Sequence, residues 1–177
     1  MKKLKNSELN RISIEEFKNY SKTPIKVLLD NIRSAHNVGS IFRSCDAFLI
    51  DEIILCGITA KPPNKEIRKT ALGSTDSVKW SYFENIKDAI LKLKQEKYQI
   101  ISVEQADKST YLKNFKIQSK KKYAIIFGNE INGVNQKVID MSDDVVEIPQ
   151  FGTKHSFNVS VSVGIVIWDF FTKIKTN

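Results

Sequence analysis

The stretch Ile126-Phe-Gly-Asn-Glu130-Ile-Asn-Gly133 decides the fold, because an apolar run ends there in small and polar residues. The same change occurs at Glu147-Ile-Pro149-Gln-Phe-Gly152, and Ser156-Phe-Asn158-Val-Ser160 follows it. Strands of a parallel sheet present backbone groups to a ligand at their carboxyl ends in this way. We therefore expect these two strand ends to lie close together and to form a binding site.

Expected strands and helices alternate along the rest of the chain. Apolar runs predict strands at residues 25–30, 52–56, 98–103, 123–127 and 145–148. Helical signals occur at residues 13–20, 37–49, 84–97 and 136–141, whereas residues 57–64 are expected to form a loop. The first helix begins with the capping box Ser13-Ile-Glu-Glu16. Alternation of this kind predicts an α/β fold with a mainly parallel sheet flanked by helices.

The segment that follows Asn37 has two distinct faces. Its apolar residues recur with the spacing of a helix packed on a sheet, and they are Val38, Ile41, Phe42, Cys45 and Leu49. Ser40, Ser44 and Ala47 form a neighbouring face of small residues beside Arg43. A bulky ligand has room to approach Arg43 along that face.

The last apolar segment, residues 159–171, fits two kinds of structure. Valine alternates with serine over residues 159–163, which suits a strand as well as a helix. The apolar run then continues to Phe171, which is too far for a typical strand, so its length favours a helix. Because this helix is apolar on nearly every face, we expect it to be buried, partly in a subunit interface.

The composition is that of an ordinary globular protein with a basic surface. The 177 residues suit one domain, and the chain is 41% hydrophobic and 27% charged. The net charge of +8 favours a polyanionic partner such as RNA. Basic residues cluster in residues 2–26 and around the Pro62-Pro63 turn, which are the better RNA candidates. The Lys120–Lys122 triplet is equally explained as charge beside an apolar strand.

Cysteine, histidine and hydropathy patterns define the expected compartment. Cys45 and Cys56 lie in apolar segments and do not form a metal-type pair, so we interpret them as buried free thiols of a reducing cytosol. His36 and His155 are isolated, and no metal site is expected. The basic start lacks the apolar stretch of a signal peptide, and no segment approaches a membrane span. The sequence therefore predicts a cytoplasmic protein that has no membrane partner.

A further motif near the amino end is Asp30-Asn-Ile-Arg-Ser-Ala-His-Asn37-Val-Gly39-Ser-Ile-Phe-Arg43. Together with the motifs quoted above, it resembles those of the SpoU-type RNA 2'-O-ribose methyltransferases of the SPOUT superfamily. The resemblance runs from about Val27 to Phe171 in the correct order. It implies an α/β knot with a C-terminal trefoil knot, and a homodimer in which both subunits build the RNA groove. Residues 1–177 would form one SPOUT methyltransferase domain, with residues 1–24 as a short basic extension that contains a helix.

The resemblance also implies a cofactor and a set of site residues. The cofactor is S-adenosylmethionine, and its expected contacts are Val103, Gly128, Ile148, Ser156 and Phe157. The expected catalytic residues are Arg43, Asn37, Glu130, Ser156 and Asn158. We expect Arg43 to act on the ribose hydroxyl and the others to hold the site. Phe157, where leucine or methionine is usual, and the Gln150-Phe-Gly152 turn depart from the family pattern without changing these catalytic residue types.

Arg43 can act in two ways. An arginine side chain is effectively always protonated, so its use as a base near neutral pH would cost roughly 7 kcal/mol. A cation that holds a phosphate and stabilises developing alkoxide charge incurs no such cost, so electrostatic activation is favoured, with proton loss to phosphate or water. Structural alternatives exist for single residues: an ion pair of Arg43 with Asp46, a helix-start carboxylate for Glu130, and a helix cap for Asn158.

The resemblance leaves the RNA substrate open. Lys69-Thr-Ala-Leu-Gly73 and Ser102-Val-Glu-Gln105 resemble the TrmH-like branch, which methylates a D-loop guanosine of tRNA. The chain lacks the extra amino-terminal RNA-binding domain of some rRNA enzymes, which also favours tRNA over rRNA. An rRNA 2'-O-methyltransferase and a noncatalytic RNA-binding module are the alternatives. A Rossmann-type nucleotide-binding protein is disfavoured, because no G-x-G-x-x-G follows the first strand.

Overall fold

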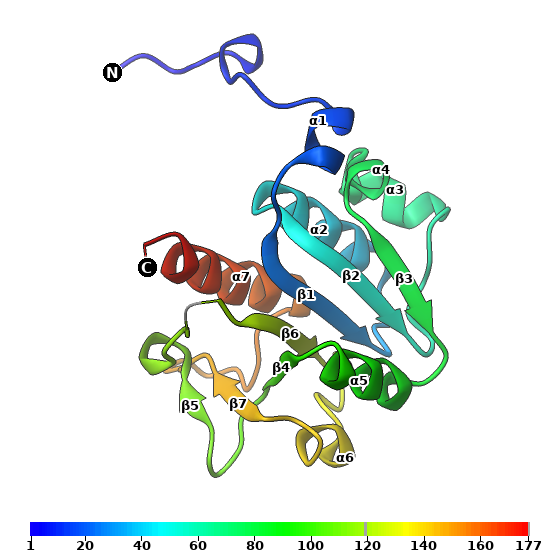
Figure 1. The fold of residues 1–177 in the computed structure, drawn as a ribbon, viewed down its shortest axis with the longest axis vertical. Coiled ribbons are helices and arrows are strands. Elements are labelled where there is room, and N and C mark those ends of the chain that lie inside the picture. Colours follow the sequence, from blue (N-terminus) through cyan, green and yellow to red (C-terminus); the bar gives the residue numbers. More distant parts are fainter. Residues whose placement is uncertain (119, 177) are drawn as a thin grey trace.

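A computed structural model describes residues 1–118 and 120–176 and contains one sheet of seven strands in the order β3-β2-β1-β6-β4-β7-β5 (Figure 1). Every neighbouring pair of strands in this sheet is parallel. The strands are β1 (Thr23–Asp30), β2 (Ile50–Cys56), β3 (Trp80–Phe83), β4 (Tyr98–Val103), β5 (Thr110–Tyr111), β6 (Lys122–Phe127) and β7 (Asp144–Glu147).

Helices connect the strands and cover both faces of the sheet. The α-helices are α1 (Ile14–Asn19), α2 (Ala35–Ala47), α3 (Lys65–Ala71), α4 (Ser74–Ser77), α5 (Ile86–Gln95), α6 (Gln136–Ile139) and α7 (Val159–Thr176). Two short 3₁₀ turns, η1 (Asn6–Glu8) and η2 (Leu112–Asn114), complete the described elements.

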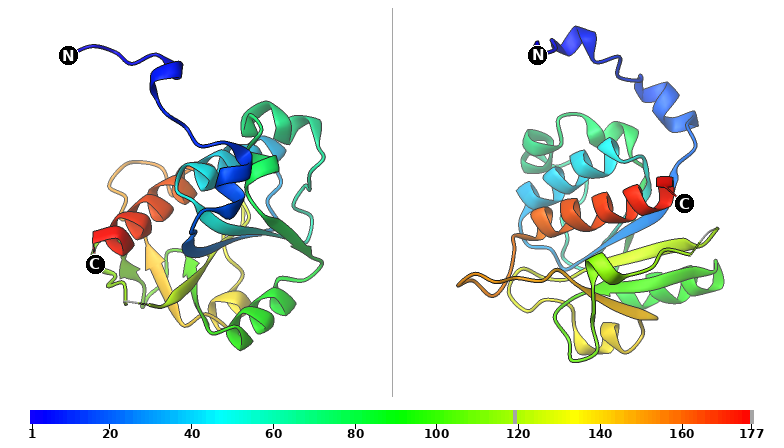
Figure 2. Two further views of the ribbon diagram at one scale, coloured as in Figure 1. Left: turned by 45° about the horizontal axis from the view of Figure 1, so that its top comes forward. Right: turned by 90° about the vertical axis from the view of Figure 1, so that its left-hand side faces the viewer.

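The strands of the sheet centre are buried on both faces, and their side chains alternate between two apolar clusters. Val27 and Leu29 of β1 point into a core shared with α2 and α7, whereas Leu28 points into a core shared with α5. Figures 1 and 2 show α2 and α7 together on one face and α5 with α6 on the other. Burial on both faces explains why β1 is a continuous apolar run without polar alternation.

The predicted fold class, an α/β fold with a mainly parallel sheet flanked by helices, is confirmed. The capping box at Ser13 is present, because the Ser13 hydroxyl accepts from the Glu16 N–H and the Glu16 side chain accepts from the Ser13 N–H. Residues 57–64 form a loop, and the ambiguous segment after residue 158 is a helix, as its length indicated. Knotted threading of the chain stays a prediction.

The burial expected for residues 159–171 is only partly present in a single chain. Val163, Val166, Ile167 and Phe170 of α7 are buried against the sheet, but Trp168 on the opposite face is 54% exposed. A helix that packs on one face of a sheet covers only one stripe of its surface, so burial of the other face in a subunit interface stays a prediction.

The sequence did not predict β3, α3 or α4. β3 has only four residues at an edge of the sheet, where a short aromatic run resembles a loop. α3 begins directly after the Pro62-Pro63 turn, and its signal was the cap: the Asn64 side chain accepts hydrogen bonds from the N–H groups of Glu66 and Ile67.

The first residues of the chain lie apart from the sheet. Residues 1–16 are exposed wherever their side chains are described, and the segment projects away from the body in both views of Figure 2. α1 attaches this segment through Phe17, whose side chain is buried in the larger core. None of the helices described in residues 1–118 and 120–176 has the length and hydropathy needed to span a lipid bilayer.

Candidate active site

The carboxyl ends of β4, β6 and β7 surround one cavity of about 480 Å³, which we call the main cavity. These strands are neighbours in the sheet, so their ends lie side by side. The five expected cofactor contacts Val103, Gly128, Ile148, Ser156 and Phe157 all line this cavity. The remaining lining residues are Glu104, Gln105, Phe127, Asn129 to Val134, Gln136, Ile139, Glu147, Gln150, His155, Val159 and Ser162.

Gly128 begins a tight turn that forms one wall of the main cavity. Asn129 and Gly133 exchange backbone hydrogen bonds of 3.1 and 2.8 Å across this turn. A Cβ atom on Gly128 would collide with the backbone of Gly133 and Val134. Gly133 itself has a φ of 63°, in the left-handed region that favours glycine. The two glycines of the stretch that opened the sequence analysis are therefore needed to fold this wall.

Glu104 and Gln105 fasten the end of β4 to the other two walls. The Glu104 carboxylate accepts a hydrogen bond of 2.8 Å from the N–H of Val134, in the turn after β6. The Gln105 side chain donates one of 2.6 Å to the carbonyl of His155, in the loop after β7. Sequence reasoning missed these connecting roles, although both residues lie in the quoted Ser102–Gln105 motif.

Glu130 lies at the amino end of α2. Its carboxylate accepts hydrogen bonds from the N–H groups of Arg33 (2.9 Å) and Ser34 (3.1 Å), and from the side-chain amide of Asn37 (3.2 Å). The helix dipole favours a negative charge at this position. Burial raises the pKa of Glu130, but the hydrogen bonds outweigh that effect and hold the pKa below its ordinary value. Glu130 is therefore a carboxylate at the start of a helix, as the structural alternative for this residue stated. The helix is α2, which precedes Glu130 in the sequence.

Asn37 joins Glu130 to Asn158. The Asn37 side chain donates to Glu130 through its nitrogen and accepts a hydrogen bond of 3.1 Å from Asn158 through its oxygen. Asn158 also accepts hydrogen bonds from the N–H and hydroxyl of Ser160 (2.9 and 2.6 Å), which caps the start of α7. Three of the five predicted catalytic residues thus form one continuous network that links segments far apart in the sequence.

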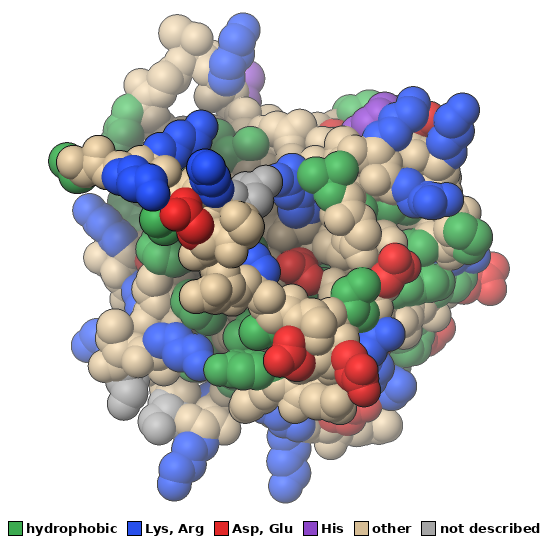
Figure 3. Space-filling model, turned by 90° about the horizontal axis from the view of Figure 1, so that it is seen from above, with side chains coloured by type: hydrophobic (Ala, Val, Ile, Leu, Met, Phe, Trp, Pro, Cys, Tyr) green, Lys and Arg blue, Asp and Glu red, His purple; other side chains and the backbone are tan. Residues whose placement is uncertain are grey.

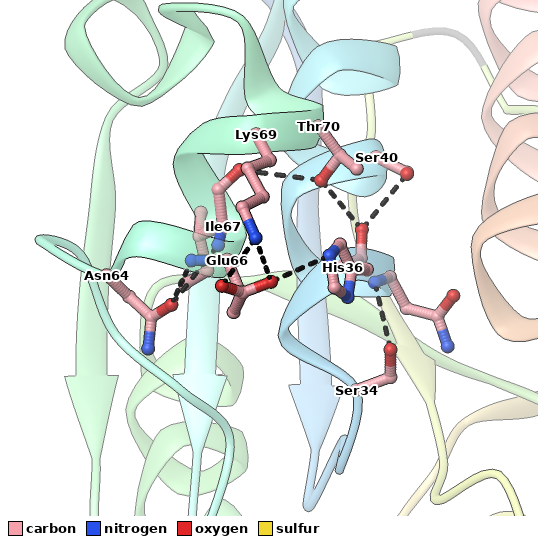
Figure 4. A network of polar contacts seen from close by, with 9 residues as sticks. Ser34, His36, Ser40, Asn64, Glu66, Ile67, Lys69 and Thr70 are labelled. Atoms are coloured by element: carbon pink, nitrogen blue, oxygen red, sulfur yellow. Dashed lines mark hydrogen bonds and ion pairs between the residues drawn. The ribbon is translucent and has the colours of Figure 1, made fainter.

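The position of α2 is set by close packing against α3. A Cβ atom on Gly39 would collide with the Thr70 hydroxyl and the Ile67 carbonyl, so only glycine lets the two helices approach this closely. Figure 4 shows the contacts between the helices: the Thr70 hydroxyl donates to the carbonyl of His36 at 2.9 Å, and the His36 ring lies 2.9 Å from Glu66. These contacts fix the first turn of α2, which carries Asn37.

The main cavity has an acidic lining. Among the residues that the structure describes, its lining includes the carboxylates Glu104, Glu130 and Glu147 but neither lysine nor arginine. Apolar side chains such as Val103, Phe127 and Ile148 share the lining with a similar number of polar ones. A cavity of this size that combines apolar surface with polar groups is typical of small-molecule sites. The carboxylates favour a ligand that carries positive charge and disfavour one that carries phosphate.

Arg43 lies outside the main cavity in the single chain. It is six residues beyond Asn37 on α2, which corresponds to about 9 Å along the helix axis. Its side chain is exposed and pairs with none of the described residues. Asp46, the partner expected for a structural role, instead accepts a hydrogen bond of 2.5 Å from the Ser77 hydroxyl. The structure therefore brings the cofactor contacts together but does not bring Arg43 to them within one chain.

Arg43 separates two open depressions of the surface. One, of about 480 Å³, is lined by Ser40, Ser44, Ala47, Phe48 and Thr70, and it matches the small-residue face predicted beside Arg43. The other, of about 800 Å³, runs from Arg43 to Arg11 between α2 and the amino-terminal segment. We call this second depression the arginine groove. Lys and Arg side chains are spread over this end of the molecule, with apolar side chains between them (Figure 3).

The cysteines and metal-ligating side chains show no further reactive site. Cys45 and Cys56 are buried and free, as predicted, and burial raises the pKa of the Cys56 thiol to about 12. Within residues 1–118 and 120–176, no group of three His, Cys, Asp or Glu side chains is placed to hold a metal ion.

A model of a family described as the SpoU rRNA Methylase family matches residues 24–168. The 23S rRNA (guanosine-2'-O-)-methyltransferase RlmB of Neisseria meningitidis is 29% identical over 159 residues, which cover 89% of this chain and 62% of that protein. The tRNA (guanosine(18)-2'-O)-methyltransferase of Aquifex aeolicus is 30% identical over 148 residues, 81% of this chain and 66% of that enzyme. The chain thus spans about three fifths to two thirds of the length of these relatives.

Solved structures show the same fold. The A. aeolicus TrmH/SpoU tRNA modifying enzyme superposes with a TM-score of 0.80 at 24% identity, over 92% of this chain and 81% of that one. An AdoMet-bound rRNA methyltransferase from Sinorhizobium meliloti superposes with a TM-score of 0.78, also at 24% identity, over 87% of this chain and 59% of that one. Both similarities establish a shared architecture.

Proposed function

The chain belongs to the SpoU rRNA methylase family, and from this membership we propose that it transfers a methyl group from S-adenosylmethionine to the 2'-oxygen of a ribose in RNA. The observation that carries the proposal is the main cavity, whose lining includes all five expected donor contacts and the Glu130 carboxylate. The network of Asn37, Glu130 and Asn158 adjoins that cavity and connects it to the helix that carries Arg43.

The chemistry of the main cavity fits this methyl donor. S-adenosylmethionine carries a sulfonium and an ammonium against one carboxylate, so its net charge is positive, and Glu104, Glu130 and Glu147 favour it electrostatically. The adenosine part suits apolar walls such as Val103 and Ile148, with free backbone groups at the strand ends for its polar edge. When bound, the donor supplies an electrophilic methyl group on sulfur. A dinucleotide or another phosphate-bearing cofactor would meet three carboxylates there and, among the described residues, neither lysine nor arginine.

The acceptor side requires positive charge, which Arg43 supplies. As the new carbon–oxygen bond forms, the methyl carbon–sulfur bond of the donor would break, leaving the thioether S-adenosylhomocysteine, and the ribose hydroxyl would lose its proton to a phosphate oxygen or to water. The Arg43 guanidinium holds the neighbouring phosphate and stabilises the negative charge that develops on the ribose oxygen. Ser156 and Asn158 orient the reacting groups, and Asn37 holds Asn158 by their 3.1 Å hydrogen bond.

The surface beside Arg43 suits a polyanion. Arg11 and Arg43 line the arginine groove together, and Lys2, Lys3 and Lys5 are exposed in the segment that precedes Arg11. Lys26, which the sequence placed in the same basic cluster, is not available to RNA, because it is buried and pairs with Glu52 at 2.8 Å. Phosphate contacts of this kind supply much of the affinity for RNA and weaken as salt rises. RNA is therefore the proposed partner, and the cytoplasm, where buried thiols stay reduced, is the proposed location.

The proposed assembly is a homodimer that covers the exposed face of α7. Trp168 and Phe171 pack on Phe48 of α2 with ring centroids 5.5 and 5.4 Å apart, and this aromatic cluster borders the depression beside Arg43. Aromatic side chains in such a position are typical of interface centres. A second copy seated here would enclose Arg43 and bring main-cavity residues of one subunit toward the acceptor side of the other.

tRNA is the favoured substrate, because motifs of the chain resemble the TrmH-like branch. Relatives named for tRNA and for 23S rRNA methylation are about equally similar to this chain. An rRNA substrate is the alternative, and a noncatalytic RNA-binding module would retain the fold without transfer.

One incubation separates these possibilities. The protein is mixed with radiolabelled S-adenosylmethionine and either tRNA or rRNA from cells that lack 2'-O-methylation. Label in the tRNA alone is the expected result, and label in rRNA alone would replace the favoured substrate by the alternative. Donor binding without label in either RNA would contradict the enzymatic proposal and favour the module.

A further inference from the structure

Phe151 is 94% exposed, the highest value among the phenylalanines that the structure describes. It lies in the loop of residues 148–158, which connects β7 to α7 and carries Gln150, Ser156 and Phe157 into the lining of the main cavity. A large aromatic side chain in full contact with water contributes nothing to folding and gains most from a partner that covers it. Its neighbour Gln150 lines the main cavity, which points to a partner that is present during the reaction.

The charge of the loop of residues 148–158 favours an anionic partner. Residues 148–158 contain Lys154 and His155 but no aspartate or glutamate. Gly152, next to Phe151, has no atom within 4 Å of its potential Cβ position, so the neighbouring backbone is open to a ligand. A flat aromatic ring beside a lysine matches the two parts of a nucleotide, because the ring stacks on the base and the cation contacts the phosphate.

The distance to the reacting centre is limited by the chain. Ser156 lies five positions after Phe151, which at 3.3–3.6 Å per residue gives a reach of at most about 18 Å. Phe151 thus lies close enough to meet a nucleotide near the methylated ribose but projects outside the main cavity.

We propose that Phe151 stacks on an unpaired base of the acceptor RNA that flanks the methylated nucleotide, with Lys154 contacting the adjoining phosphate. This inference rests on the proposed function, because it assumes an RNA acceptor at the main cavity. It assigns a specificity-determining role to a turn at which this chain departs from the usual family sequence. The aromatic ring selects RNA in which that base is free to leave its own helix.

Two other partners for the ring make different predictions. A ring that closes over the methyl donor would affect donor affinity, and a ring buried by a second copy would affect dimer association. Stacking on RNA affects neither. The experiment therefore measures RNA affinity, donor affinity and oligomeric mass for the same variants.

The variants are Phe151→Ala, which removes the ring, and Phe151→Trp, which keeps a stacking surface. Leu91→Ala is the control, because Leu91 is an exposed apolar residue of α5 that lines none of the described cavities. Fluorescence anisotropy measures binding to a fluorescein-labelled tRNA transcript and a labelled 23S rRNA fragment. Calorimetry measures S-adenosylmethionine affinity, and analytical ultracentrifugation measures mass.

Phe151→Ala should weaken binding to the better-bound RNA by about 5- to 150-fold, while Phe151→Trp and Leu91→Ala stay within about twofold of the parent protein. Donor affinity and mass should not change. Equal RNA affinity for Phe151→Ala and the parent would overturn the inference, as would failure of both RNAs to bind. A matching loss of donor affinity or of dimer mass would also overturn it, because the ring would then cover the donor or a second copy.

A second set of RNAs locates the base. Single abasic nucleotides are placed in turn on both sides of the methylated position. One abasic site should weaken binding to the parent protein and leave Phe151→Ala unaffected. Methyl transfer by the parent protein is recorded separately, so absence of transfer refutes the enzymatic proposal, whereas equal sensitivity of both proteins to every abasic site refutes only the role of Phe151.

Discussion

The main cavity and the arginine groove differ in charge and in the elements that wall them. The main cavity lies between three strand ends and is lined by three carboxylates, whereas the arginine groove lies between α2 and the amino-terminal segment and carries Arg11 and Arg43 with one carboxylate, Asp46. A cationic methyl donor suits the first and a phosphate backbone suits the second. The difference indicates that donor binding is a property of the single chain, whereas acceptor activation depends on groups that one chain leaves exposed.

The network of Asn37, Glu130 and Asn158 is the physical connection between these regions. Glu130 lies in the main-cavity turn and holds the amino end of α2, while Arg43 lies further along the same helix. A rigid helix transmits the position of its first turn to Arg43. If this comparison is correct, substitutions in the two regions have separable effects.

The largest effect is expected for Arg43→Ala. Removal of a cation that stabilises developing charge should lower methyl transfer on the order of 10²- to 10³-fold, while the donor dissociation constant stays within about twofold. Single-turnover kinetics and calorimetry measure the two quantities. Lys87→Ala, an exposed cation on α5, is the matched control and should change neither. A large loss of donor affinity in Arg43→Ala would mean that Arg43 acts on the methyl donor and not on the RNA acceptor.

The next effect concerns closure of the acceptor side by a second copy. Trp168→Asp puts a charge at the exposed aromatic cluster and should weaken dimer association by about 30- to 1,000-fold, with methyl transfer reduced in proportion. Sedimentation equilibrium gives the association constant, and Leu91→Asp serves as the control. A parent protein that sediments as a monomer, or an unchanged variant, would mean that α7 is not the interface.

A pair of glycines sharpens the description of the main cavity. Gly128→Ala places a methyl group against the backbone of Gly133 and Val134, so it should cost about 1–3 kcal/mol of folding free energy and abolish donor binding. Gly152→Ala, in the open loop, should stay within about 0.5 kcal/mol of the parent protein. Urea unfolding and calorimetry compare the two. Similar behaviour of both variants would show that the turn after β6 is not a rigid wall.

The smallest effect is the pH dependence of Glu130. Its pKa lies below the ordinary value of 4.5, so its charged form stabilises the fold above pH 4.5, and this contribution is lost as the pH falls through the folded-state pKa. Glu130→Gln should therefore cost about 1 kcal/mol at pH 7, reduced by solvent screening, and nothing in acid. Melting curves from pH 7 to 3 follow the difference. A difference that grows on acidification would contradict this assignment.

The sequence predicted the parts of the site that depend on local pattern. The change from an apolar run to Gly128 and to Ile148-Pro149 marks a strand end, and the ends of parallel strands meet at one edge of a sheet. Two walls of the main cavity could be predicted for that reason, whereas Val103, Ser156 and Phe157 were expected from the resemblance alone. The resemblance to SpoU enzymes contributed Asn37 and Asn158, whose contact joins residues 121 positions apart and leaves no local signal.

The remaining features depend on packing that the sequence does not show. The strand order places β6 between β1 and β4, and no periodicity distinguishes this order from others. Glu104 connects the end of β4 to the turn after β6 by accepting a 2.8 Å hydrogen bond from the N–H of Val134. This role can be recognised only once the position of that turn is known. The position of Arg43 outside the main cavity follows from the direction of α2, which the packing of Gly39 against α3 determines.

The most direct test of the account is the chemical identity of the product. RNA is incubated with the protein and with S-adenosylmethionine that carries an isotopically labelled methyl group, then digested to nucleosides and resolved by liquid chromatography and mass spectrometry. The account predicts labelled methyl on the ribose of a nucleoside, and its loss in Arg43→Ala. Label on a base, or ribose methylation that persists in Arg43→Ala, would contradict the division between an acidic donor cavity and a cationic acceptor side.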